Sequence, residues 1–273
     1  MIQFIQKHLT VFQSALFKTT CTVVENDDFL LIVDPNWLPQ EIEAIQHHVE
    51  TVRGKRELYL LFTHGDFDHI IGYRAFPDAK IIGSKGLQHH PKKENTLGQI
   101  RKFDNDYYID RPYPIEFPVC DIVIEDDGQL FTSGNMTLTF YLAPGHSHDG
   151  IFTVIEPQGI LIAGDYLSDF ELPFIYDSAK SYLKTLQTAK EILLRHHIKV
   201  LVPGHGKATD QLHEMRTRFE SSQKYLDKLI SAVMREDAQE LDLLAKEMPY
   251  PSSFTAECHA ENIAIIKKEY ITK

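Results

Sequence analysis

Two histidines and two aspartates lie within six residues of one another in the segment Thr63-His64-Gly65-Asp66-Phe67-Asp68-His69. Imidazole nitrogens and carboxylate oxygens are the ligands that many catalytic metal ions take from proteins. The segment follows the apolar run 57–62, which predicts a buried strand, and precedes residues that can begin a helix. Alternate side chains of an extended segment share one face, and a turn into a helix redirects the last histidine. The segment is therefore a candidate for binding two metal ions on a strand-to-helix loop.

Three later segments each place one further metal-competent residue directly after a glycine. His146 follows the apolar run 138–142, Asp165 follows 160–162, and His205 follows 200–202. Each run predicts a strand, so each residue is expected at a strand end, where glycine lets the backbone approach a metal centre closely. One such motif is weak evidence, but four in one chain favour a single shared site.

With these motifs and with Asp34 in the segment 31–35, the chain resembles the metallo-β-lactamase superfamily of metallohydrolases. The resemblance spans roughly residues 20–206 and does not cover the C-terminal part. It implies an α/β fold, a four-layer αβ/βα sandwich with the metals between the upper edges of its two sheets. Asp34 matches an aspartate that supports a ligand in this family, whereas an ordinary Asp-Pro turn is the alternative reading.

The resemblance also implies which residues bind metal. The implied ligands are His64, Asp66 and His146 at one site, Asp68, His69 and His205 at a second site, and Asp165 as a bridge between them.

Asp66 is a departure from the family pattern His-x-His-x-Asp-His, because it stands in place of the second histidine. A carboxylate lowers the formal charge of the site by one unit and is harder than an imidazole. We expect two divalent metal ions, zinc first, with iron or manganese as the metals that Asp66 favours. In a further alternative, Asp66 leaves one site empty and the enzyme uses one metal.

The residues predict metal-assisted hydrolysis, in which a metal-bridging hydroxide attacks the substrate and the ions stabilise the developing oxyanion. Asp68 can also accept or relay a proton, and Asp165 joins it as a catalytic candidate. No Gly-x-Ser-x-Gly motif is present, and Cys21, Cys120 and Cys258 show no catalytic spacing. The expected substrate is a small-molecule ester, thioester, lactone, amide or phosphoester. The alternative function, motivated by Asp66, is a non-heme diiron protein that binds or reduces oxygen or nitric oxide.

Two neighbours of the implied ligands need separate treatment. His148 lies two residues after His146, which alone directly follows Pro-Gly, so His148 is interpreted as a residue behind the ligands or facing substrate, or as a plain loop histidine. Tyr166 directly follows Asp165 and is interpreted as a residue behind the ligands or facing substrate. Its position is an imperfect match to lactonase relatives, which weakens the lactonase option. The pair His89-His90 is interpreted as solvated surface.

Composition limits the possible partners and location. The 273 residues are 43% hydrophobic and carry a formal net charge of −11, which argues against nucleic acid as a partner. No apolar stretch is long enough for a membrane span, and no secretory signal is evident at the N-terminus. Three widely spaced cysteines fit a reducing compartment. We therefore expect a cytoplasmic enzyme with a small-molecule substrate.

Two segments lie outside the strand-end motifs. Residues 84–118 show little periodicity and predict a long loop that caps the metal cleft through Tyr107, Tyr108 or Tyr113, or packs peripherally. Residues 1–206 are expected to form the metal-binding domain, and 207–273 a helical extension packed on it. That extension covers a sheet edge, lines the pocket or makes a homodimer contact.

Overall fold

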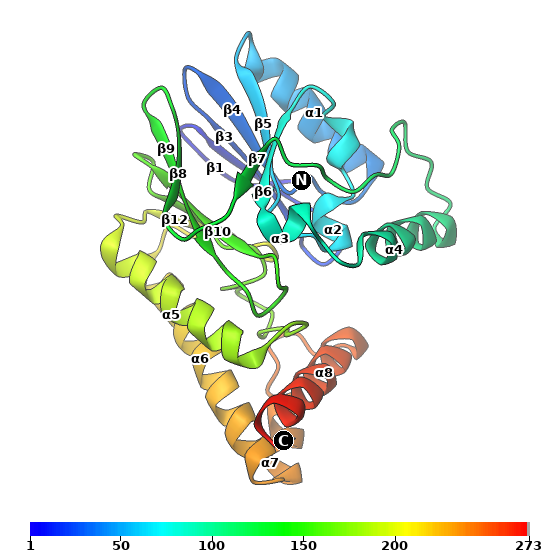
Figure 1. Ribbon diagram of the computed structural model, residues 1–273, viewed down its shortest axis with the longest axis vertical. Coiled ribbons are helices and arrows are strands. Elements are labelled where there is room, and N and C mark those ends of the chain that lie inside the picture. Colours follow the sequence, from blue (N-terminus) through cyan, green and yellow to red (C-terminus); the bar gives the residue numbers. More distant parts are fainter. Residues whose placement is uncertain (272–273) are drawn as a thin grey trace.

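Two β-sheets pack face to face at the centre of the protein, and helices lie on the outer side of each sheet (Figure 1). A computed structural model describes residues 1–271. The first sheet contains, in spatial order, β1 (Ile2–Gln6), β2 (Leu9–Gln13), β3 (Thr20–Glu25), β4 (Phe29–Val33), β5 (Glu57–Leu61), β6 (Lys80–Ser84) and β7 (Ile122–Ile124). The second contains β12 (Val200–Val202), β11 (Ile160–Ile162), β10 (Ile151–Glu156), β9 (Met136–Leu142) and β8 (Gln129–Ser133). The predicted αβ/βα sandwich is confirmed.

The helices flank these sheets in chain order. They are α1 (Pro39–Arg53), α2 (Phe67–Ile70), the 3₁₀ turn η1 (Tyr73–Ala75), α3 (Lys85–Gln88), α4 (Lys93–Asp106), α5 (Ala179–Arg195), α6 (Leu212–Met234), α7 (Ala238–Lys246) and α8 (Ser253–Tyr270). The last three form the predicted helical C-terminal region, while the boundary at residue 206 stays a prediction. Within residues 1–271, every helix is too short or too polar to span a membrane.

The central strands of the first sheet are buried on both faces, which explains their nearly continuous apolar sequences. In β4, Leu30 and Ile32 pack in the hydrophobic cluster under the outer helices, whereas Leu31 and Val33 pack between the two sheets. This division follows from the alternation of side chains along a strand. A strand covered on both sides has no polar face, so it shows no apolar-polar alternation in sequence.

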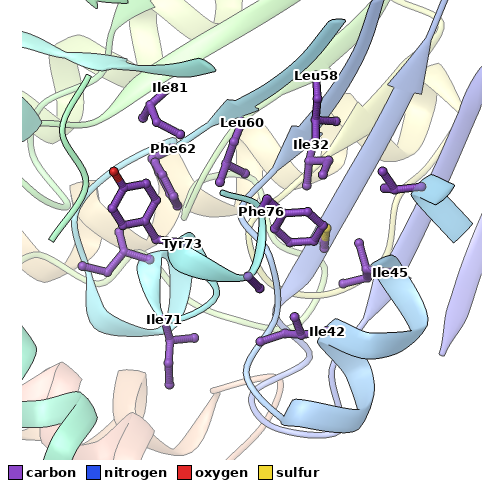
Figure 2. Packing of buried hydrophobic residues seen from close by; sticks show 14 of the residues in the cluster. Ile32, Ile42, Ile45, Leu58, Leu60, Phe62, Ile71, Tyr73, Phe76 and Ile81 are labelled. Atoms are coloured by element: carbon purple, nitrogen blue, oxygen red, sulfur yellow. The ribbon is translucent and has the colours of Figure 1, made fainter. Parts of the chain in front are cut away.

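The outer face of the first sheet is closed by α1 and by the segment that follows the His64–His69 loop. Figure 2 shows Ile42 and Ile45 of α1 on the same side of the sheet as Phe76 and Tyr73. The ring of Tyr73 meets the ring of Phe62 edge-on at 5.9 Å between centroids. The loop with the candidate ligands is therefore held between a buried strand before it and buried aromatic residues after it.

Helices α5 and α6 cover the outer face of the second sheet. Ser178 caps α5, because its hydroxyl oxygen accepts a hydrogen bond from the Ser181 backbone N–H at 3.1 Å. Leu186 and Ala189 of α5 pack in one cluster with Leu161 of β11 and Leu226 of α6. Helix α5 therefore acts as scaffold behind the site.

The structure corrects the expectation for residues 84–118. Much of this segment is helical, since it contains α3 and α4, and the irregular part begins at Tyr107. Tyr107 and Tyr108 are exposed, and Tyr113 accepts a hydrogen bond from Arg111 at 3.1 Å. None of these three tyrosines lines the cavity described below, which favours peripheral packing over the expected tyrosine contact with substrate. The face of α4 lines that cavity instead.

Candidate metal centre

Parallel strands of the first sheet bring the N-terminal half of the candidate site together. Strands β4 and β5 are parallel, with Val33 opposite Leu61, so the residues that follow them meet at one edge. Asp34 follows β4, and its backbone N–H donates to the Leu61 carbonyl at 3.1 Å. The His64–His69 loop follows β5, and the single helical turn α2 carries Asp68 and His69. The buried strands thus fix both backbones at the site.

The second sheet delivers the remaining residues to the same edge. Asp165 follows β11 and His205 follows β12, and these strands are parallel with Ile162 opposite Val202. His146 follows β9, and its backbone N–H donates to the Tyr166 hydroxyl at 3.0 Å. All four sequence motifs therefore converge, although they come from two different sheets.

Two groups of three side chains form around the carboxylate of Asp165. In the first group, Asp66 Oδ2 lies 3.6 Å from His64 Nε2 and 3.3 Å from His146 Nε2. In the second, Asp68 Oδ2 lies 3.4 Å from His69 Nε2 and 3.3 Å from His205 Nε2.

Asp165 lies between these groups. Its Oδ2 is 3.2 Å from Nε2 of both His146 and His205, and its Oδ1 is 3.1 Å from His69 Nε2. One carboxylate thus contacts histidines of both groups. The structure brings all seven predicted ligands together, and the grouping is the one that the sequence resemblance implies.

The donor atoms at the centre fit metal ions. Nε2 of His64, His69 and His146 and Oδ1 of Asp165 are buried and have no hydrogen-bond partner among the described residues. Buried polar atoms are nearly always satisfied, so a convergent set of unsatisfied nitrogen and oxygen atoms indicates ligands. Imidazole with carboxylate is a donor set of zinc and of non-heme iron sites.

The other ring nitrogen of each histidine is held by an acceptor. His64 Nδ1 lies 3.0 Å from Thr63 Oγ1, and His69 Nδ1 lies 3.0 Å from Asp34 Oδ2. His146 Nδ1 lies 2.9 Å from the Phe174 carbonyl, and His205 Nδ1 lies 2.8 Å from the Phe17 carbonyl. A hydrogen on Nδ1 leaves the lone pair on Nε2, which points to the centre. These four contacts set the tautomer that metal binding requires.

Asp34 is placed behind the ligands, as predicted. It accepts hydrogen bonds from the Thr63 backbone N–H at 2.9 Å and from the Thr63 hydroxyl at 2.5 Å, besides the contact with His69. Because the Thr63 hydroxyl donates to Asp34, its oxygen is free to accept from His64 Nδ1. One buried carboxylate therefore orients two histidines, one directly and one through Thr63.

The charges of the cluster are strongly coupled. Burial disfavours the charged form of Asp66, but the adjacent His146 and His64 imidazoles outweigh it and hold the Asp66 pKa well below its usual range. Burial lowers the pKa of His146, yet the Asp165 carboxylate outweighs this and raises the pKa to about 10. Asp165 in the same way raises the pKa of His205 and of His69 against the effect of burial. The site attracts cations strongly.

Tyr166 and His148 take different places. Tyr166 is buried, and its hydroxyl donates toward the carbonyls of Ala143 and Pro144 at 3.2 and 3.0 Å, so it steadies the His146 loop from behind. His148 lines the cavity and stays outside both groups around Asp165.

A cavity of about 980 Å³ opens over the centre. Asp66, Asp68 and Asp165 lie on its floor, and Glu171 lines it from the loop after β11. Burial raises the pKa of Glu171 to about 7, with His205 acting against the shift and Asp165 adding to it. The sequence analysis missed Glu171, although a carboxylate among the apolar residues that follow Asp165 was a usable signal.

Two helices form the sides of the cavity. Lys92 and Lys102 line it near α4, and Glu257 and Glu261 line it from α8. Figure 1 shows α4 and α8 on either side of the open edge of the sandwich. Of the three roles expected for the C-terminal extension, the structure supports the lining of the pocket.

A family model described as the metallo-beta-lactamase superfamily matches residues 15–205. The chain belongs to this superfamily. It is 23% identical to a metallo-beta-lactamase type 2 of Bacillus sp. (strain 170) over 210 residues, covering 76% of this chain and 74% of that protein. It is also 23% identical to the acyl-coenzyme A thioesterase MBLAC2 of Homo sapiens over 198 residues, covering 66% and 68%.

Solved structures share the fold at lower identity. The sec-alkylsulfatase Pisa1 from Pseudomonas sp. has a TM-score of 0.70 and 14% identity, and the match covers 99% of this chain but 50% of the sulfatase. The rubredoxin oxygen:oxidoreductase from Desulfovibrio gigas has a TM-score of 0.59 and 16% identity, covering 84% of this chain and 62% of that one. This chain thus spans half to about three fifths of these two proteins.

Proposed function

We propose that the protein is a dinuclear metal-dependent hydrolase that cleaves a thioester or ester in a small molecule. The observation that carries this proposal is the Asp165 carboxylate, which lies between two ligand groups on the floor of a large cavity. The kinship to acyl-coenzyme A thioesterases favours the thioester among the bonds that the sequence allowed.

Bound divalent ions supply Lewis acidity and lower the pKa of water. The residues of the chain contribute the rest. Asp68, on the cavity floor, is placed to accept a proton from water, and its own pKa lies below its usual range because the adjacent His69 and His205 outweigh burial. Glu171 lines the same cavity and is the candidate to donate a proton to the leaving group.

The cavity walls suit a substrate that carries both polar and apolar parts. Phe174 and Phe254 provide apolar surface, whereas Lys92 and Lys102 provide positive charge at one side. An acyl chain would pack on the aromatic rings, and an anionic leaving group would face the lysines. The negative side chains on α8 would disfavour an anion bound at the opposite wall.

A second candidate is a diiron protein that binds or reduces oxygen. Asp66 favours it, because a carboxylate at this ligand position suits iron, and the fold is shared with a rubredoxin oxygen:oxidoreductase. The match covers 62% of that protein.

Metal analysis combined with a substrate panel tests the proposal. The protein, purified without added metal, is expected to contain two ions per chain and to hydrolyse acyl thioesters faster than phosphoesters and lactams. His146→Gln should lose metal and activity together, whereas His213→Gln on α6 should lose neither, as a matched control. Two iron ions with an oxygen-sensitive absorption band and no hydrolysis would replace the hydrolase with the oxygen-reactive protein.

A further inference from the structure

A second cluster of metal-competent side chains lies at the rim of the cavity, apart from the seven residues around Asp165. His90 follows α3, and His148 and Asp149 lie in the loop between β9 and β10. One ring nitrogen of each histidine and one oxygen of Asp149 all lie within 4.8 Å of one another. The rings of His90 and His148 are 4.8 Å apart between centroids, and both residues line the cavity.

Asp149 is the member of this cluster whose buried carboxylate lacks a hydrogen-bond donor. Its side chain is 0% exposed, and neither carboxylate oxygen has a hydrogen-bond partner among the described residues. The nitrogen His148 Nδ1 lies 3.9 Å from Asp149 Oδ1, which is beyond hydrogen-bond distance. A buried carboxylate without a donor or a cation is costly, so such groups bind metals, pair with charges or take up a proton.

The fold fixes the position of this carboxylate. The Ser84 hydroxyl donates to the Asp149 carbonyl at 2.6 Å and accepts from the Leu87 N–H at 3.0 Å, so one side chain caps α3 and ties the Asp149 loop to it. A Cβ at Gly65 would lie 2.8 Å from Asp149 Oδ2, and one at Gly86 would lie 2.7 Å from Asp149 Cβ. Asp149 therefore occupies a slot that these two glycines leave open.

The histidines are more adaptable than the carboxylate. The Lys92 backbone N–H donates to His90 Nδ1 at 3.2 Å. The neutral ring therefore carries its hydrogen on Nε2, and it must give up either this hydrogen or the contact with Lys92 to bind a metal ion. His148 has a side-chain exposure of 38%. Ligands of a tetrahedral zinc ion lie about 3.3 Å apart, so the two rings would have to rotate toward the fixed carboxylate to close the cluster.

We propose that His90, His148 and Asp149 form a separate, mononuclear site for a divalent cation of the zinc type. Two imidazoles and one carboxylate are a donor set of zinc sites that keep a fourth position open. That position would face the cavity, where an anionic group of a substrate can reach it. This site gives His148 and His90 a role that the sequence did not indicate, because His90 was interpreted as solvated surface and His148 as a residue near the ligands or a plain loop histidine.

Equilibrium dialysis against buffered Zn²⁺ tests the site. Metal-depleted wild-type protein is expected to bind one more zinc ion per chain than either His90→Gln or Asp149→Asn. His89→Gln is the matched control, since His89 is the exposed neighbour of His90 and lies outside the cluster. It should bind as many ions as wild type. Cobalt(II) should give a visible ligand-field absorption in wild type that is weaker by one site's contribution in His90→Gln.

Equal zinc binding by wild type and His90→Gln over the whole dialysis range would overturn the proposal, as would an equal loss in His89→Gln. If Asp149→Asn fails to fold, as judged by circular dichroism, His90→Gln still decides, because it changes a side chain on the cavity rim. The difference of one ion does not depend on how many ions bind around Asp165. The rim site and the dinuclear hydrolase can therefore fail separately.

Discussion

Asp34→Asn should weaken metal binding without removing any ligand. The carboxylate faces three donors, namely the Thr63 N–H, the Thr63 hydroxyl and His69 Nδ1. Asparagine keeps one oxygen for the backbone N–H but turns an NH₂ group toward the other two donors. His69 would then favour a hydrogen on Nε2, the atom that points to the centre. Loss of such a supporting contact costs roughly 10–100-fold in metal affinity, which is about 1.4–2.7 kcal/mol.

Thr63→Val separates the two branches of this network. Valine removes the hydroxyl that accepts from His64 but leaves the Thr63 backbone N–H and the contact between Asp34 and His69. We expect an affinity loss of about tenfold in the group of His64 alone. The free energy of unfolding should fall by about 1–2 kcal/mol in the metal-free protein, because a buried hydrogen bond is lost.

Competition with a chromophoric chelator measures both binding steps, and thermal unfolding followed by circular dichroism verifies the fold. In Asp34→Asn the step assigned to Asp68, His69 and His205 should weaken more than the other step, and in Thr63→Val the order should reverse. Asp34→Asn protein that is folded and binds both ions as tightly as wild type would refute the role given to Asp34. If the same metal-binding step weakened in both variants, the two-branch arrangement would be refuted.

Three further predictions concern the charges of the site. Asp66→His should raise the preference for zinc over iron, measured by competition between the two metals; an unchanged preference would contradict the role of the carboxylate. Because the His146 pKa is raised to about 10, metal must displace a proton near pH 7; affinity should therefore rise with pH, and calorimetry in buffers of different ionisation enthalpy should detect proton release. Glu171 has a folded pKa of about 7 against an ordinary value of 4.5, so its protonated form favours the folded state below pH 4.5 and this contribution is lost as pH rises through 7. In urea unfolding of the metal-free protein, Glu171→Gln should therefore raise the free energy of unfolding over wild type by about 1–2 kcal/mol at pH 8, after allowance for partial exposure, and by little at pH 4.5. Equal increases at both pH values would contradict this assignment.

The central ligands could be found from sequence because each one is signalled locally. A buried strand is recognisable in sequence as an apolar run, and the residues that follow it lie at the sheet edge. His64, His146, Asp165 and His205 all obey this rule. The strand ends therefore revealed the site before any contact between segments was known.

Other features depend on contacts between distant segments and gave no local signal. Helix α4 buries only Thr96, Leu97 and Ile100, and this short apolar face, with Gly98 inside it, did not show a helical period. Asp149 lies in the polar sequence Gly-His-Ser-His-Asp-Gly, which gives no sign of burial, because the glycines that pack against it lie about 60 and 85 residues away in sequence. Burial of a polar side chain is a tertiary property that periodicity does not report.

The way in which the two ligand groups are shared between the sheets has a consequence for unfolding. Each group takes two residues from the loop after β5 and one from the second sheet, and Asp165 also comes from the second sheet. Neither half of the sandwich can hold an ion alone, so ions bind only the assembled state and stabilise it by mass action. An ion held by either group would link the two sheets, so a chelator should make the junction between them the first place where the two halves of the sandwich separate.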